Sequence, residues 1–249
     1  MQYTLREVVQ NRLLWIVLFF ALIGIGGAAF VGDLAIIENR AVETSLLAAA
    51  YRFCAVFVMV IVVISTIVRE FNDKCLVLYL SLPISRAIYF VGKLAGFYIA
   101  GIIVAFIFSL IMAYYADFPR ALLWFSSLAC EIILMTTFGL FCVITFNQQV
   151  LASLSAAFLF YLLCRVSDTI YLISQGEILL HTTGSTFIQW VVKVLVVVLP
   201  NLERFTRTEW LAYGDFSAGD VMFPIVAQTV IYTVLAAAAA LIDFRRKNL

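Results

Sequence analysis

The stretch REFNDKCLVLYLSLPISRAIYFVGKLAG, residues 69–96, contains a charged interruption, residues 69–87, between two long apolar runs of the chain. The run before it covers residues 46–68, and the run after it covers residues 88–115. Apolar runs of about 18 residues or more are typical of transmembrane helices, because a helix satisfies its own backbone polar groups inside lipid. The stretch therefore predicts two membrane-spanning helices joined by a polar segment on one side of a bilayer.

The composition of the whole chain agrees with a membrane protein. Of its 249 residues, 65% are hydrophobic and 12% are charged, whereas about 25% of the residues of soluble domains are charged. A net charge of +1 and the lack of a long basic tract argue against nucleic acid as a partner. Four further apolar runs bring the predicted transmembrane helices to six: 13–31, 122–146, 150–173 and 221–242. We expect an all-α integral membrane protein with a single membrane domain over residues 1–249.

Two other segments are predicted to lie at the membrane without crossing it. Residues 1–12 place Leu5, Val8 and Val9 on one helical face, which predicts an interfacial helix, the alternative being an ordinary polar lead-in. Residues 174–220 are mostly polar but contain the apolar run 187–200, which is short for a full crossing. We expect an interfacial or re-entrant segment there.

The distribution of Lys and Arg predicts the orientation of the chain. Six crossings place both termini on one side, and that side receives nine Lys and Arg residues against five on the other. The side richer in Lys and Arg is normally the cytoplasmic one, so both termini are predicted to be cytoplasmic. The interruption 69–87 is then cytoplasmic as well, and residues 174–220 lie outside.

Residues 69–82 have the pattern of a short helix with one apolar stripe. Pro83 would end this helix, because proline lacks a backbone N–H, and Ser85 would cap the next one. Gly92 and Gly96 have the G-x-x-x-G spacing that lets another backbone approach closely. The segment is either a contact surface for a soluble partner or a helix that merely lies on the membrane. The residues assigned to the possible contact surface are Arg69, Glu70, Phe71, Lys74, Leu78, Leu82, Pro83, Ser85 and Arg86.

The stretch resembles the first cytoplasmic loop of ABC-2-type transporter permeases. That loop has an acidic residue after the second span, a Leu-rich helix, the motif LP-[IV]-S-R, and then GK with a further glycine. The stretch LPNLERFTRTEWLAYG also resembles the sequence before the last span of some members. The residues of this chain that match the loop are Glu70, Leu80, Leu82, Pro83, Ile84, Ser85, Arg86, Gly92, Lys93 and Gly96.

The resemblance implies a permease subunit in a cell membrane, most simply a bacterial inner membrane. It implies a second permease copy, two copies of a separate ABC ATPase, an N-terminal elbow helix over 1–12, and a coupling helix within 69–86. ATP and Mg would bind in the ATPase, because this chain has no G-x-x-x-x-G-K-[ST] loop. The substrate implied is hydrophobic or amphiphilic and exported, the alternative being a cofactor or metal-centre maturation system. Small residues at Gly24, Gly26 and Gly27 suit a close helix contact, either between the two permease copies or within one.

Four ionisable residues fall deep inside predicted spans: Arg52, Glu131, Arg165 and Asp168. A charge at mid-bilayer costs about 2.5–3.5 kcal/mol on insertion scales, so such residues usually face protein or water. At ~1.5 Å per residue all four would lie in the outer half of the membrane. Pairs between Glu131 and Arg165, or between Arg165 and Asp168, are geometrically possible. The cluster is either a structural latch or part of a translocation path.

Two other classes of function are weighed against the permease. An ion-coupled carrier or a channel would need internal symmetry, midplane carboxylates or a filter, and no convincing repeat is visible. An intramembrane enzyme would need a catalytic motif, but the chain has no H-E-x-x-H and no G-x-S-x-G. No metal site is expected, because His181 stands alone and none of the five cysteines forms a C-x-x-C pair.

Overall fold

The computed structural model describes residues 13–34, 39–73, 86–147, 149–174, 194, 199–206 and 218–246, and the regular elements within them are α-helices. The helices are α2 (Leu13–Leu34), α3 (Asn39–Asn72), α5 (Arg86–Tyr115), α6 (Phe118–Thr145), α7 (Val150–Ser174), α9 (Glu203–Thr206) and α11 (Ala218–Arg246). The predicted elbow helix and residues 74–85 of the predicted coupling loop lie outside the described residues, as does most of the segment 174–220.

Four of these helices are long and apolar enough to cross a membrane. They are Thr44–Asn72 within α3, Arg86–Tyr115, Phe118–Thr145, and Val221–Arg246 within α11. Shorter apolar stretches, Trp15–Gly27 and Val150–Val166, lie in α2 and α7. The prediction of an all-α membrane protein is therefore confirmed.

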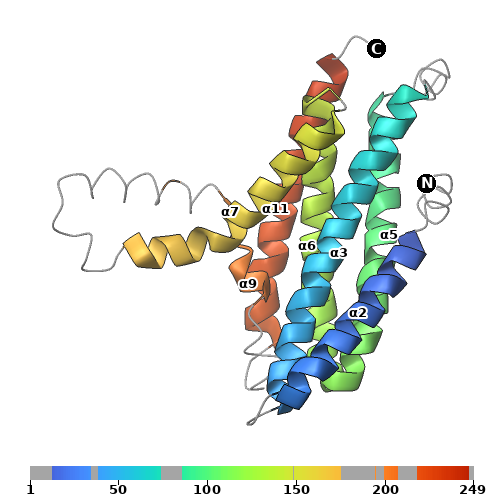
Figure 1. Ribbon diagram of the computed structural model, residues 1–249. Helices are drawn as coiled ribbons and strands as arrows, with labels where there is room; N and C mark the ends of the chain where they lie inside the picture. The colour runs from blue at the N-terminus through green and yellow to red at the C-terminus, as the bar shows by residue number, and fades with distance from the viewer. Residues whose placement is uncertain are drawn as a thin grey trace.

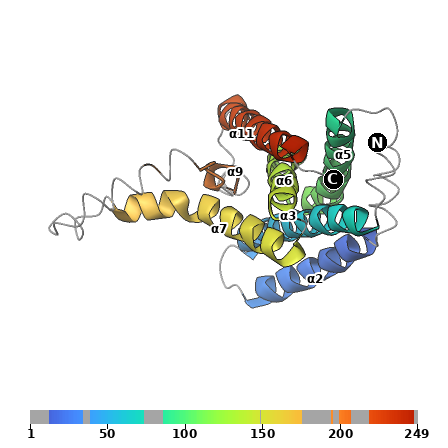
Figure 2. The ribbon, with the colours of Figure 1, turned by 90° about the horizontal axis from the view of Figure 1, so that it is seen from above.

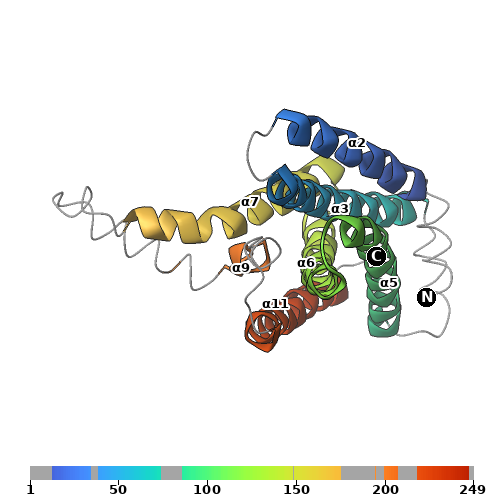
Figure 3. The ribbon, with the colours of Figure 1, turned by 90° about the horizontal axis from the view of Figure 1, so that it is seen from below.

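The central helix of the bundle is α6. It packs against α3, α5, α7 and α11, while α2 packs on α3 at the outside of the bundle. Figures 2 and 3, which look along the bundle from its two ends, show this arrangement. The C-terminal part of α7 extends away from the other helices (Figure 1). Side chains from α3, α5, α7 and α11 can therefore contact α6 in the interior of the bundle.

Short turns set the order of the neighbouring helices. Asp117 and Pro119 begin α6 directly after α5, and the backbone N–H of Ala121 donates to the Asp117 carbonyl at 2.9 Å. After α6 the chain turns at Asn147, whose φ of 50° is one that Asn adopts more readily than most residues. Only a few residues then separate α6 from α7, and the two helices pack against each other as an antiparallel hairpin.

The second predicted span needs a correction. The sequence suggested a span that ends at residue 68 and a separate helix that begins at Arg69, but α3 continues without a break to Asn72. Arg69 and Glu70 therefore belong to the last turns of α3, and Arg86 begins α5. The helix extends this far because its one buried charge here, Glu70, finds partners on α5.

Two glycines mark the closest helix contacts. A Cβ added at Gly101 on α5 would lie 2.5 Å from Cγ2 of Ile132 on α6, and one added at Gly24 on α2 would lie 2.2 Å from Cε1 of Tyr51 on α3. Gly24 thus serves a contact within the chain. At Gly92, where the sequence suggested a close approach, an added Cβ would meet nothing within 4 Å among the described residues.

Candidate functional site

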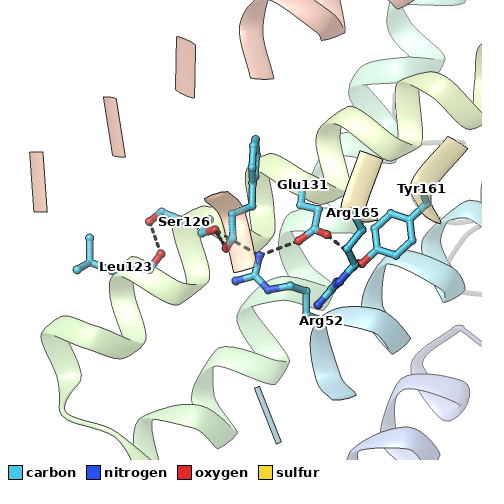
Figure 4. Close-up of polar contacts among 8 residues, drawn as sticks. Arg52, Leu123, Ser126, Glu131, Tyr161 and Arg165 are labelled. Atoms are coloured by element: carbon cyan, nitrogen blue, oxygen red, sulfur yellow. Dashed lines mark hydrogen bonds and ion pairs between the residues drawn. The ribbon is translucent and has the colours of Figure 1, made fainter. Parts of the chain in front are cut away.

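A buried polar cluster joins α3, α6 and α7; we call it the Arg52 cluster. Nη1 of Arg52 lies 2.7 Å from Oε2 of Glu131, and the two side chains are 2% and 0% exposed. The hydroxyl of Tyr161 donates to the other carboxylate oxygen of Glu131 at 3.0 Å. Figure 4 shows these groups converging on the carboxylate from opposite sides. Both oxygens of Glu131 are therefore satisfied, as a buried carboxylate requires.

Arg165 joins the cluster through Tyr161. Its Nη1 donates to the Tyr161 hydroxyl at 2.7 Å, and its guanidinium carbon lies 5.8 Å from the centroid of the same ring. The direct Glu131–Arg165 pair that the sequence allowed is not formed. Glu131 pairs with Arg52, and Tyr161 lies between Glu131 and Arg165 (Figure 4). The Asp168 side chain lies outside the described part of the chain.

The cluster also holds a segment from the predicted extracytoplasmic loop. Nη1 of Arg52 donates to Oγ of Ser127 at 3.3 Å, and that hydroxyl donates to the carbonyl oxygen of Phe205 at 2.7 Å. Leu202 and Phe205 are fully buried, and the N–H of Leu202 donates to the Cys164 carbonyl at 3.4 Å. α9 is thereby attached to α6 and α7 beside the ion pair.

Sequence reasoning found the charges of the Arg52 cluster but missed its neutral members. Ser127 lies one helical turn before Glu131, and Tyr161 lies one turn before Arg165, so each faces the same side as its charged neighbour. Trp124 is a further member, because the guanidinium carbon of Arg52 lies 5.5 Å from its ring centroid. A search one turn away from each buried charge could have found Ser127 and Tyr161, whereas Trp124 lies two turns before Glu131.

A second buried polar cluster lies where α3 ends and α5 begins, at the top of Figure 1; we call it the Glu70 cluster. Nζ of Lys93 forms an ion pair with Oε1 of Glu70, and the Tyr89 hydroxyl donates to Oε2 of Glu70 at 2.7 Å. The charged side chains are 5% and 7% exposed. Nζ of Lys93 also lies 5.5 Å from the ring centroid of Phe97. Tyr89, Lys93 and Phe97 follow one another at i,i+4, so they form one face of α5.

The Glu70 cluster connects the two ends of the segment predicted to be a coupling loop. Residues 74–85 follow α3 and precede α5, and the cluster fixes the end of one helix to the start of the other. The C-terminal end of α11 also contacts the cluster, because the Phe244 ring stacks on Tyr89 at a centroid distance of 6.2 Å. The C-terminal end of α3, the start of α5 and the C-terminal end of α11 therefore meet at this cluster.

The remaining residues predicted for the coupling surface differ in environment. Arg69 is exposed, and its Nε lies 3.7 Å from Oδ2 of Asp73, which is exposed as well. Phe71 and Arg86 are half-buried. Lys74, Leu78, Leu82, Pro83 and Ser85 lie outside the described residues.

Comparison with known proteins adds no family assignment. No protein-family model matches this chain, and no curated protein sequence matches it. Among the described residues, no group of three or more His, Cys, Asp or Glu side chains could hold a metal ion. The function proposed below rests on the residues and the geometry of this chain.

Proposed function

We propose that this chain is the permease subunit of an ATP-driven transporter of the ABC-2 type. In this proposal it has six transmembrane helices, with both termini cytoplasmic, and lies in a cell membrane of the bacterial inner-membrane type. It pairs with a second copy of itself and with two copies of an ABC ATPase that binds ATP and Mg. The substrate is a hydrophobic or amphiphilic molecule, and the direction is export.

The observation that carries this proposal is the Glu70 cluster. Glu70 and Lys93 both match the permease motif, and they form a buried ion pair that joins the ends of the loop 74–85. Removing one partner of a buried pair typically costs about 3–5 kcal/mol, because the other charge is left without compensation. A pair of this kind would keep α3 and α5 together while a soluble subunit pushes on the loop between them.

The helix α3 carries both Arg52 and Glu70, so it could pass a movement from one cluster to the other. Eighteen residues separate Arg52 from Glu70 on α3, which corresponds to about 27 Å along a helix that rises ~1.5 Å per residue. No Pro or Gly interrupts this part of α3. In the proposed mechanism α3 moves as a rigid body. A displacement at the Glu70 cluster is passed along α3 to the Arg52 cluster, which attaches α3 to α6, α7 and α9.

Purification from the native host tests the proposal. The tagged chain is extracted in a mild detergent, and the proteins that remain bound are identified and quantified by mass spectrometry. The proposal predicts an ABC ATPase at about one copy per copy of this chain. The absence of any ATPase over a range of salt concentrations would overturn it, and ion-coupled transport through Glu131 would then be the next hypothesis.

A further inference from the structure

A cavity of about 280 Å³ lies between α3, α6 and α7, next to the Arg52 cluster. Val60, Met135 and Ala157 contribute to its apolar wall. Phe57 and Phe158 also line it, and their rings meet edge to face at a centroid distance of 5.1 Å. Ligand pockets usually measure about 300–1,000 Å³, so this volume suits a single apolar chain better than a bulky molecule.

One end of this cavity is polar. Tyr161 forms part of its lining, and the Tyr161 hydroxyl accepts a hydrogen bond from Arg165 at 2.7 Å. Leu154, Phe158, Tyr161 and Arg165 follow one another at helical spacing, so Arg165 lies one turn beyond the cavity on the same face of α7. The cavity is therefore apolar along its length, and a cation lies one helical turn beyond its Tyr161 end.

The charge of Arg165 has no carboxylate partner among the described side chains. Glu131 has Arg52 at 2.7 Å and the Tyr161 hydroxyl at 3.0 Å. A guanidinium has five N–H donors, and Tyr161 accepts from one of them. Arg165 is half-buried, and its guanidinium carbon lies 5.8 Å from the centroid of the Tyr161 ring that lines the cavity.

We propose that this cavity binds a single-chain anionic amphiphile, a long-chain carboxylate, with its chain between α3 and α7 and its head group on Arg165. The planar guanidinium matches a carboxylate in a two-point hydrogen bond. The small volume favours one chain over the two chains of a phospholipid. The site is a property of this chain alone, so it can be tested without any ATPase and stands apart from the proposed transport function.

Native mass spectrometry of the full-length protein, released from phosphatidylcholine nanodiscs, tests the assignment. Palmitate is the probe, and hexadecanol is the matched uncharged chain. The wild-type protein is expected to retain one palmitate per chain. Arg165→Gln should weaken palmitate binding about tenfold or more through loss of a charge-assisted hydrogen bond, with hexadecanol binding unchanged.

Two further variants complete the test. Ser155 is exposed and lines the cavity, so Ser155→Phe should block palmitate and hexadecanol alike without disturbing the core. Arg120→Gln is the control, because Arg120 pairs with Asp117 in the turn before α6, away from the cavity. Thermal unfolding of each variant confirms that it is folded.

Four results would overturn the assignment. Palmitate binding that Ser155→Phe leaves intact would place the fatty acid elsewhere. If folded Arg165→Gln lost palmitate binding and hexadecanol binding equally, Arg165 would not be the residue that binds the carboxylate head group. Displacement of palmitate by phosphatidylglycerol would make a two-chain lipid the occupant. A dimer that Ser155→Phe dissociates, with no palmitate bound to the wild type, would make the occupant a second copy of the chain.

Discussion

Arg52 and Glu131 are 79 positions apart in the sequence, yet their side chains form a 2.7 Å ion pair between α3 and α6. Both charged side chains are buried. The Tyr161 hydroxyl donates a hydrogen bond to Glu131, and Arg52 donates one to the Ser127 hydroxyl. Such a pair is specific in geometry and sensitive to the loss of either member. It therefore gives a direct way to test whether this cluster holds the bundle together.

Glu131→Ala should destabilise the protein by about 3–5 kcal/mol, because it leaves the Arg52 guanidinium buried without a counter-charge. The double variant Arg52→Met, Glu131→Leu should regain most of that loss, since both charges are then gone. Thermal unfolding in detergent measures both effects. A Glu131→Ala variant that unfolds at the wild-type temperature would show that the pair is no latch.

Ser127→Ala should loosen the attachment of α9 specifically. The Phe205 carbonyl would lose its donor, at a cost of about 1–3 kcal/mol for an unsatisfied buried group. Hydrogen exchange should rise over residues 202–206. The control is the neighbouring Ser126→Ala, because Ser126 donates to the Leu123 carbonyl at 2.8 Å (Figure 4) and to Sδ of Met222 on α11 at 3.4 Å, and neither partner belongs to α9. Equal exchange in the two variants would contradict the attachment.

Gly24→Ala should weaken the packing of α2 on α3. The new methyl group would overlap the Tyr51 ring, whose hydroxyl donates to the Ala21 carbonyl at 2.9 Å. Overpacking of this kind costs about 1–3 kcal/mol, which a lower unfolding temperature would report. Gly26→Ala, at a position with nothing within 4 Å, should unfold like the wild type. Indistinguishable unfolding temperatures for the two variants would argue against this contact.

Variants of the Glu70 cluster should separate stability from coupling, if the proposed function holds. Lys93→Met should lower the unfolding temperature, and adding Glu70→Leu should restore most of it. The double variant should still bind the ATPase, but substrate should no longer stimulate ATP hydrolysis. Arg120→Gln is the control, because its pair with Asp117 lies just beyond the other end of α5 and contributes less than about 1 kcal/mol. Normal stimulation in the double variant would remove the cluster from the coupling mechanism.

Much of the helical layout could be predicted from the sequence because local signals decide it. The apolar run 88–115 nearly matches α5, which is Arg86–Tyr115, and Pro119 marks the start of α6. The extension of α3 to Asn72 could not be predicted, because it depends on partners of Glu70 that lie on another helix.

The candidate sites were predictable only in part. Insertion cost alone singled out Arg52 and Glu131 as buried charges. Their pairing depends on which helices α6 touches, and sequence spacing within a single helix does not contain that information. For the same reason the sequence could not identify Lys93, 23 positions further along, as the partner of Glu70.

The most direct test of the central claim is the amount of ABC ATPase that stays bound to loop variants of this chain. Leu78→Asp combined with Leu82→Asp should abolish ATPase retention, because these residues form the predicted apolar contact stripe. Gln149→Asp, in the exposed turn between α6 and α7 on the same predicted side of the membrane, should retain it fully. Equal retention by the two folded variants would contradict the claim that the loop between α3 and α5 is where the ATPase docks.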